Sequence, residues 1–280
     1  MVSTSPILHV ATTLGPLAWL RMLPLLAIHV AAVVGLVVGG SWQVWVLAAV
    51  LYALRMFGIT AGYHRYFSHR AFRTSRLGQF LLAVLAQSAS QKGVLWWAQH
   101  HRRHHAHSDG AEDGHSPVRS GFWFAHLFWI YADDGGTDLG SVRDLARYPE
   151  LRLLNTWWPV VPALLALGCF LAYGWPGLLI GFCLSTVCCW HATFCINSLA
   201  HCWGSRRYAT ADASRNNALL ALLTFGEGWH NNHHYAPGAA RQGFFWWEID
   251  CTWYCLRLLA ACGLISELRP PPARVNAEAA

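Results

Sequence analysis

Two long stretches of this sequence contain no charged residue. The first comprises the 33 residues between Arg21 and Arg55, and the second extends from Leu153 to Ser205. A helix that crosses a lipid bilayer needs about 20 predominantly apolar residues, so each stretch has room for two such helices. Each is also broken near its middle, the first by Gly-Gly-Ser at 39–41 and the second by Tyr-Gly-Trp-Pro-Gly at 173–177. The sequence therefore predicts two membrane hairpins.

These hairpins define the expected fold class, an all-α integral membrane protein with four transmembrane helices. We expect the helices at about 22–38, 42–58, 157–173 and 176–196. Residues 1–21 then form an N-terminal segment, and residues 22–268 form a single membrane domain. Within that domain, 59–156 and 197–268 form a helical cap outside the bilayer. The Pro-rich tail, 269–280, is expected to be disordered.

The composition supports a membrane protein and argues against other classes. Charged residues make up 12% of the 280 residues and hydrophobic residues 55%. Soluble domains carry about 25% charged residues. A soluble enzyme, a disordered chain and a nucleic-acid-binding protein are therefore disfavoured.

The basic residues indicate the orientation. All 20 lysines and arginines lie outside the two charge-free stretches, and neither hairpin turn contains one. By the positive-inside rule, both termini and the segment between the hairpins face the cytoplasm. No basic n-region and small-residue cleavage site precede the first apolar run, which argues against a cleavable signal peptide. We expect a multi-pass protein of a bacterial inner membrane.

Two further apolar segments are not expected to cross the membrane. Leu77–Ala98 is interrupted by glutamines, serines and Lys92, so we expect it at the interface or inside the protein. Phe244–Leu264 carries Glu248, Asp250 and Arg257 and is interpreted as an interfacial helix. The nine cysteines include no CxxC pair, which predicts free thiols, with no disulfide and no cysteine metal site.

Histidine is the outlier of the composition, with 16 residues. Nine of them lie in internal clusters: His64 and His69; His101, His104 and His105; His201; and His230, His233 and His234. In the predicted topology all nine lie on the cytoplasmic side. Nine imidazoles are too many for one metal ion and suit two. Imidazole binds Zn, Cu, Fe and Ni, so the ligand type alone does not identify the metal.

The spacing within the clusters predicts how their rings point. Residues at i, i+3 and i+4 share one face of a helix, so each three-histidine cluster is expected to converge on one point. On an α-helix, residues five positions apart point in different directions. His64 and His69 would therefore serve different ions or lie where a helix frays. The other seven histidines are interpreted as structural or exposed: His9, His29, His100, His107, His115, His126 and His191. One of His107, His115 and His126 could orient a ligand.

The order and spacing of the clusters resemble the histidine boxes of integral-membrane fatty-acid desaturases. The resemblance extends from about Gly58 to Leu268 and is closest to the acyl-CoA Δ9, or stearoyl-CoA-type, branch. The matching motifs are His64-x4-His69, His101-x2-His104-His105, Asn197-Ser-Leu-Ala-His201 and Glu227-Gly-Trp-His230-Asn-Asn-His233-His234.

The resemblance implies a mechanism and a set of site residues. Two iron ions (Fe²⁺/Fe³⁺) would use O2 to remove two hydrogens from an unactivated acyl chain. The nine clustered histidines would be their ligands, and Asn197 would act through a water molecule. The residues that bend the acyl tunnel of the family, and so set a cis double bond and its position, correspond to Gln91, Trp97 and Thr193. This correspondence supports a Δ9 product.

The expected substrate is a long-chain acyl-CoA, but the acyl carrier stays open. Positions that help hold CoA in the animal members correspond here to Lys92, Gln99 and His100, which are only partly similar. A stretch that is basic in those members reads Ala-Asp-Asp-Gly-Gly at 132–136. A phospholipid-bound or carrier-protein-bound acyl chain is the alternative.

Further residues are expected to support the metal site. Asp109, Asp113 and Glu227 are candidates to orient ligand imidazoles, the alternative being simple surface charge. Because the chain contains no recognisable flavin, nicotinamide, haem or iron–sulfur motif, electrons must come from a separate ferredoxin-, rubredoxin- or cytochrome b5-like donor and its reductase. Such a donor would dock on four basic residues of the cap: Arg102, Arg103, Arg206 and Arg207. The alternative is that these arginines only mark the membrane edge.

Two alternative functions stay open. A related diiron lipid hydroxylase or acetylenase would use the same residues. A membrane metal transporter is a more distant alternative, because transporters place polar ligands at mid-membrane and only His29 and His191 lie within the predicted spans.

Overall fold

The structure is a computed structural model that describes residues 15–132 and 136–277, and most of these residues are helical. The two strands, β1 (Arg73–Thr74) and β2 (Ile265–Ser266), form one short antiparallel pair. His9 and the aspartates at 133 and 134 lie outside the described residues. The mostly helical fold is therefore confirmed for the part of the chain that the structure describes, and the four membrane crossings stay a prediction.

The first hairpin consists of α2 (Pro16–Val38) and α3 (Trp42–Phe57), and α3 continues without a break into the π-helix η1 (Gly58–Ser68). The turn begins at Gly39, whose φ of 72° is a left-handed value that favours glycine. The hydrophobic stretch of α2 is only 22% buried, and Val37 is 82% exposed. A helix that exposes so much apolar surface is suited to contact with lipid.

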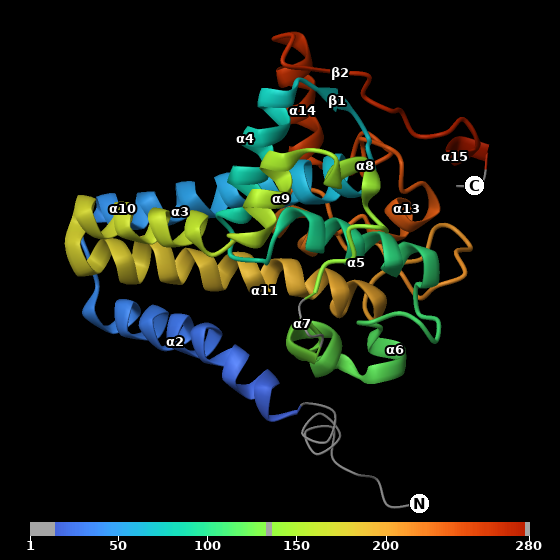
Figure 1. Ribbon diagram of the computed structural model, residues 1–280. Helices are drawn as coiled ribbons and strands as arrows, with labels where there is room; N and C mark the ends of the chain where they lie inside the picture. The colour runs from blue at the N-terminus through green and yellow to red at the C-terminus, as the bar shows by residue number, and fades with distance from the viewer. Residues whose placement is uncertain (1–14, 133–135, 278–280) are drawn as a thin grey trace, which may run out of the picture.

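The second hairpin consists of α10 (Val160–Pro176), followed by the π-helix η3 (Gly177–Leu184) and α11 (Ser185–Asn197). The chain turns back at Tyr173 and Gly174, where Gly174 has a φ of 60°. Figure 1 shows α10 and α11 side by side, with α3 next to them and the N-terminal end of α2 set apart. The break predicted at 173–177 is thus found within that stretch.

Three helical segments among the described residues are long and apolar enough to cross a membrane: Pro16–Val38, Trp42–Ser68 and Val160–His201. The third holds 42 residues and contains the turn at Gly174, so it comprises both arms of the second hairpin. A buried arginine joins the hairpins. Arg55 in α3 is 1% exposed and donates hydrogen bonds to the hydroxyls of Ser185 and Thr186 in α11. These hydroxyls satisfy a cation that would otherwise be costly to bury.

The cap consists of short helices between and after the hairpins. Its core contains fully buried side chains from η1, α4, α5 and α14, including Phe67, Ala83, Leu95 and Leu256. The helices are α4 (Arg76–Gln87), α5 (Val94–His107), α6 (Pro117–Ser120), η2 (Phe124–Phe128), α7 (Trp129–Ala132), α8 (Arg143–Ala146), α9 (Pro149–Thr156), η4 (Leu199–His201), α12 (Ala218–Leu223), α13 (His230–Tyr235), α14 (Cys251–Ala261) and α15 (Arg274–Ala277).

The two additional apolar segments do not form spanning helices. Leu77–Ala98 is divided between α4 and α5 by an irregular turn in which Ser90 and Lys92 have positive φ. In Phe244–Leu264, Glu248 and Asp250 are buried at 0% exposure and pair with Arg207 and Arg65. These carboxylates therefore stabilise the interior of the cap.

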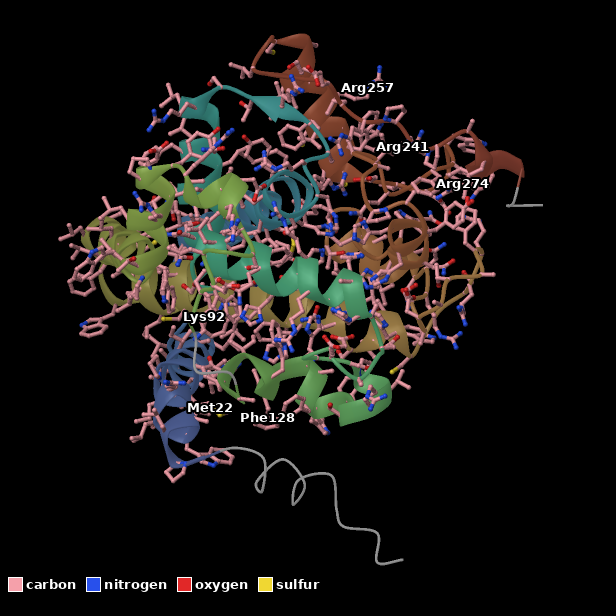
Figure 2. The ribbon with its side chains drawn as sticks, turned by 45° about the vertical axis from the view of Figure 1, so that its right-hand side comes forward. Met22, Lys92, Phe128, Arg241, Arg257 and Arg274 are labelled. Atoms are coloured by element: carbon pink, nitrogen blue, oxygen red, sulfur yellow. The ribbon has the colours of Figure 1, made fainter. Side chains whose placement is uncertain are left out.

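The first and the last described segments of the chain both pack against the rest of the molecule. Figure 2 shows Met22 beside Phe128 and, at the opposite end, Arg241, Arg257 and Arg274. Met22 belongs to a small apolar cluster with Phe128, which places the N-terminal half of α2 against η2.

The tail differs from the expected disorder in residues 269–277. The backbone of Arg269 bonds to Ala71 and Ala240, and Val275 is buried beside Tyr208. The expectation is corrected for these residues because backbone pairing and an apolar contact outweigh the Pro-rich composition. All nine cysteines are free thiols, in agreement with the prediction.

Candidate metal centre

The structure brings the nine clustered histidines together in two adjacent groups. In each group the candidate ligand nitrogens all lie within 4.8 Å of one another. The rings of His105 and His234, one from each group, have centroids 4.5 Å apart. The five-histidine group consists of His64, His69, His101, His105 and His233, and the four-histidine group of His104, His201, His230 and His234.

His64 and His69 belong to the same group, so the expectation that they point apart is wrong. That expectation assumed α-helical geometry, but these residues lie in and directly after the π-helix η1. A π-helix bonds residue i to residue i+5, and the backbone N–H of His69 donates to the carbonyl of His64 at 3.2 Å. The spacing of five therefore returns to the same face.

Close packing against α4 accompanies this π-helix. A Cβ atom at Gly58 would lie 2.9 Å from the backbone nitrogen of Ala86, and one at Gly62 would lie 3.2 Å from the carbonyl of Leu82. Only glycine allows α4 to approach the helix this closely without a shift.

Each three-histidine cluster is divided between the groups, which corrects the expectation of a single convergence point. His101 and His105 belong to the five-histidine group, whereas His104 belongs to the four-histidine group. In α13 the pattern is reversed, since His230 and His234 lie in the four-histidine group and His233 in the five-histidine group. Adjacent residues are about 100° apart on a helix, so neighbouring histidines can serve two centres.

Carboxylates fix the orientation of four of the rings. Asp113 accepts from Nδ1 of His104 at 3.0 Å, Asp109 from His201 at 3.0 Å, and Asp212 from His234 at 2.9 Å. Glu227 contacts Nδ1 of His64 in the same way. An ionised carboxylate only accepts, so each Nδ1 carries the proton and each Nε2 presents its lone pair to the centre. Asp109, Asp113 and Glu227 thus occupy the places expected from the sequence.

Three residues that position the site were missed by the sequence analysis. Asp212 lies in a loop 22 positions before His234, and nothing in its local sequence marks it. The Gln242 amide lies 3.4 Å from Nδ1 of His233. Arg65, which is 1% exposed, bridges Glu227 at 3.1 Å and Asp250 at 2.9 Å. Arg65 stands directly after His64, and its place in the first motif is the only local signal for it.

The electrostatics favour neutral imidazoles. Burial and the neighbouring rings lower the pKa of His101, His105, His230 and His233 well below its usual range. Burial likewise lowers the pKa of His234 to about 4, against the opposing effect of Asp212. Burial alone would raise the pKa of Asp109, but the hydrogen bond and charge interaction with His201, together with hydrogen bonds from Ser116 and Ala213, outweigh it and lower the pKa to about 2. Neutral imidazole is the form that binds a metal.

The converging nitrogens fit a bound cation. Nε2 of His230 lies 3.0 Å from Nε2 of His201 and 3.0 Å from Nε2 of His234. The last two nitrogens present lone pairs, because their Nδ1 atoms donate to carboxylates. At most one hydrogen lies among the three nitrogens, whereas a metal ion would satisfy all three lone pairs. Imidazole nitrogens suit iron among other transition metals.

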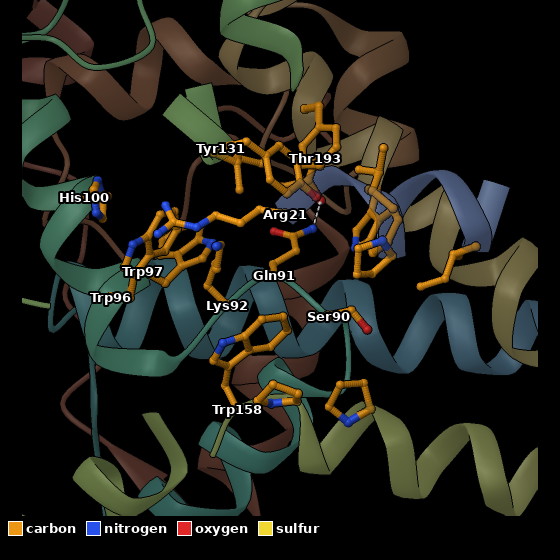
Figure 3. Close-up of a pocket in the computed structure, with 18 of the residues that line it drawn as sticks. Arg21, Ser90, Gln91, Lys92, Trp96, Trp97, His100, Tyr131, Trp158 and Thr193 are labelled. Atoms are coloured by element: carbon orange, nitrogen blue, oxygen red, sulfur yellow. Dashed lines mark hydrogen bonds between the residues drawn. The ribbon is translucent and has the colours of Figure 1, made fainter. Parts of the chain in front are cut away.

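A cavity of about 340 Å³ adjoins the five-histidine group. Its lining includes His101 and Asn197 together with Gln91, Trp97 and Thr193, the three expected tunnel residues. The Gln91 amide donates to the Thr193 hydroxyl at 3.2 Å, as drawn in Figure 3. The Trp97 ring stacks on His101 with centroids 4.9 Å apart. A volume of about 300–1,000 Å³ is typical of small-molecule sites.

The cavity also contains cationic side chains near its aromatic wall. Figure 3 shows Lys92 and Arg21 in the pocket, with Trp96 and Trp158 nearby. The Lys92 ammonium lies 5.7 Å from the ring of Trp96, 5.7 Å from Tyr131 and 6.0 Å from Trp158. These distances allow cation–π attraction.

The four arginines expected to form a docking face do not form one set of free cations. Arg102 pairs with Asp144, Arg207 pairs with Glu248, and Arg206 donates to backbone carbonyls of the 210–212 loop. Arg103 is exposed on α5. The isolated histidines also differ in their surroundings. His115 stacks on His104, whereas His29, His191 and His126 form a separate hydrogen-bonded chain.

The apolar helices and the two histidine groups together define a membrane protein with a histidine-rich metal site. A family model described as fatty acid desaturase matches residues 40–250. The chain therefore belongs to the fatty acid desaturase family, and it is a membrane oxidoreductase of lipid metabolism.

Relatives within the family differ in substrate. The chain is 36% identical over 238 residues to the "sn-2 palmitoyl-lipid 9-desaturase" of Nostoc sp. (strain 36), covering 83% of this chain and 84% of the relative. It is 38% identical to the "Delta-9 acyl-lipid desaturase 2" of Arabidopsis thaliana, covering 82% and 76%. It is also 36% identical to the "Acyl-CoA C20 Delta5-desaturase" of Anemone leveillei, covering 82% and 75%. Their names include two kinds of acyl carrier and two double-bond positions.

Proposed function

We propose that this protein is a diiron desaturase that introduces a cis double bond into a saturated long-chain acyl group. The observation that carries the proposal is the pair of adjacent histidine groups, one of which adjoins a largely apolar cavity through His101. Iron ions held there would supply the oxidising power that no side chain has for an unactivated methylene group. Overall, O2, two electrons, two protons and the two hydrogens of the chain give two molecules of water and the alkene.

The proposed ligands are the nine histidines, five for one iron and four for the other. Asn197 precedes His201 by four residues and lines the cavity with His101. The four-histidine group has one ligand fewer than the five-histidine group. A water molecule held by Asn197 would supply this missing ligand. Asp109, Asp113, Asp212 and Glu227 hold the proton on the outer nitrogens of their rings.

The cavity residues would set the shape of the product. Gln91 and Thr193 bridge α11 and the turn before α5, and Trp97 covers the histidine at the inner wall. A chain that must bend around this bridge presents one pair of carbons to the irons and keeps a cis geometry. The match of these three residues to the stearoyl-CoA-type branch supports the Δ9 position.

The proposed acyl carrier is coenzyme A, and the second candidate is a glycerolipid. Lys92 and Arg21 give the cavity cations that would bind an anionic headgroup of either kind. The second candidate is supported by the names of the Nostoc and Arabidopsis relatives, which both specify acyl-lipid desaturation. A purified protein supplied in parallel with stearoyl-CoA and with labelled phospholipid separates the two candidates.

The proposed topology has four crossings, with both termini and the metal site at the cytoplasmic side of a bacterial inner membrane. The arginine distribution and the turn at Gly174 support it. A separate ferredoxin-, rubredoxin- or cytochrome b5-like protein, with its reductase, would supply the electrons.

Expression in a host that lacks unsaturated fatty acids, followed by gas chromatography–mass spectrometry, tests the activity. We expect a cis monounsaturated product with the double bond at carbon 9. A hydroxylated or acetylenic product would assign the site to a related diiron enzyme instead.

A substitution in the bridge tests the cavity assignment. Thr193→Phe removes the Gln91 bond and fills the bend, so we expect a changed chain-length or positional preference. Cys188→Phe, on the exposed side of the same helix, is the matched control. An unchanged product profile in Thr193→Phe would contradict the tunnel role.

A further inference from the structure

Three aromatic rings outside the set of cavity-bending residues form a continuous stack that ends on a proposed iron ligand. The ring of Trp129 stacks on His115 with centroids 4.4 Å apart and an interplanar angle of 28°. His115 in turn stacks on His104 with centroids 4.3 Å apart and an angle of 26°. His104 belongs to the four-histidine group.

The inner part of this stack is held rigidly. Asp113 accepts from Nδ1 of His104 at 3.0 Å and from the backbone N–H of His115 at 3.2 Å. The His115 side chain is nearly buried, and Asp113 is buried as well. His104 already has its tautomer fixed by the carboxylate, so His115 is not required for that purpose. Orientation of the metal ligands therefore does not explain why His115 stacks between Trp129 and His104.

The outer part of the stack reaches a second hollow. Trp129 and His115 line both the acyl cavity and a second pocket of about 240 Å³. The rest of that pocket is lined by His100, Arg103, His104, Gly114 and Ala132. Arg103 and Gly114 are exposed, so this hollow adjoins the surface of the cap. All three rings of the stack line this hollow. His104 and His115 are buried whereas Trp129 is partly exposed, so the stack leads from a partly exposed ring to a member of the four-histidine group.

We propose that electrons enter the metal centre through the Trp129–His115–His104 stack. This inference rests on the proposed function, because a desaturase consumes two external electrons in each cycle. A reduced one-electron carrier protein would bind over the second hollow. It would lose one electron per encounter and reduce one ferric ion, so that two encounters reduce both. Trp129 and His115 would act as positioning residues, since neither is required as a metal ligand. The acyl cavity remains free for substrate.

The test measures reduction of the metal directly, without acyl substrate and without turnover. Ferric protein in detergent is mixed with reduced [2Fe–2S] ferredoxin, rubredoxin or cytochrome b5, and the donor that reduces the unchanged protein fastest is kept. Reduction is followed by stopped-flow absorbance and checked by Mössbauer spectroscopy. Dithionite serves as a small reductant that does not need the protein path. All rates are expressed per bound iron.

The variants are Trp129→Leu and His115→Leu, with His115→Phe retaining a ring at the same place. Trp123→Leu, which changes an exposed tryptophan in the same segment, is the matched control. We expect both leucine variants to slow reduction by the protein donor about tenfold, or ~1.4 kcal/mol in activation free energy. Reduction by dithionite and the iron content should stay unchanged, and His115→Phe and Trp123→Leu should behave like the unchanged protein.

Three results would overturn the inference. Equal slowing with both reductants would show that the stack only supports the structure of the site. Unchanged rates in both leucine variants would place the electron path elsewhere. If no carrier protein reduces the unchanged protein, the inference that an external protein supplies the electrons is wrong. A protein that holds no iron, or makes no unsaturated product, contradicts the proposed function instead, so the two failures are distinguishable.

Discussion

The protein contains two histidine assemblies of different construction. In the nine-histidine centre, Nδ1 of four rings bonds to a carboxylate, and the Nε2 atoms converge. In the chain formed by His29, His191 and His126, the rings are joined end to end. Nε2 of His29 lies 3.0 Å from Nε2 of His191, Nδ1 of His191 lies 3.0 Å from Nε2 of His126, and Nδ1 of His126 lies 2.9 Å from the Ser198 hydroxyl.

This difference shows what distinguishes a metal site from buried histidines. The Leu25 carbonyl accepts from Nδ1 of His29 at 2.8 Å, which leaves the lone pair on Nε2 of His29. His191 therefore donates its Nε2–H back to His29, and His126 donates its Nε2–H back to His191. Every nitrogen of the chain has a hydrogen-bond partner, and no lone pair is left for a cation. In the nine-histidine centre, outer acceptors occupy the Nδ1 atoms and leave surplus lone pairs at the middle. The carboxylates therefore matter as much as the number of imidazoles.

The largest effect is expected from removing a ring of the centre. His233→Ala deletes an Nε2 that lies 2.9 Å from His64 and 2.8 Å from His105. We expect loss of detectable product and of bound iron, with normal insertion into the membrane. Gas chromatography, iron analysis and membrane fractionation check this. His126→Ala, from the other assembly, is the control. Full activity in His233→Ala would remove this histidine from the ligand set.

A smaller effect is expected from removing an outer acceptor. Asp212→Ala releases the Nδ1 proton of His234 and allows the wrong tautomer, which should weaken iron binding about 10–100-fold. Asp212→Asn keeps an acceptor oxygen without the charge and should fall between Ala and the unchanged protein. Iron titration with a competing chelator measures the affinities. Glu112→Gln, at an exposed carboxylate, is the control, and equal affinities in all variants would contradict the role of Asp212.

Sequence reasoning succeeded where a pattern is local. The hairpin turn at Gly174 and the helical placement of His101 and His105 follow from charge-free runs and spacing. Gln91, Trp97 and Thr193 line one cavity, but only the resemblance to known desaturases drew attention to them.

Sequence reasoning failed where the outcome depends on tertiary packing. The shared face of His64 and His69 requires a π-helix, which accompanies close contact of Gly58 with α4. Asp212 reaches His234 from a distant loop, and Arg65 is paired by residues more than 160 positions away. The chain of His29, His126 and His191 joins three separate elements, so no single motif predicts it.

Bound iron should protect the nine-histidine centre against unfolding by acid. The pKa of His234 is about 4 in the folded protein, below its ordinary value of 6.5. Below pH 6.5 the unfolded chain therefore binds more protons than the folded one, and this contribution to stability is lost as the pH falls towards 4. Bound iron keeps the nine rings neutral, so iron-loaded protein should unfold at a lower pH than iron-free protein. Thermal unfolding from pH 7 to 4, with and without iron, measures the difference, and coincident acid midpoints would contradict it.

The smallest effect is expected from breaking the three-histidine chain. His191→Phe keeps a ring of similar shape but removes both bonds, leaving one nitrogen of His29 and one of His126 without their partner. Unsatisfied buried groups cost about 1–3 kcal/mol each, so thermal stability should fall measurably. Iron content should not change, because the chain offers no converging lone pairs. Loss of iron in His191→Phe, with stability retained, would mean that the two assemblies are coupled and that hydrogen-bond saturation does not separate a structural histidine from a ligand.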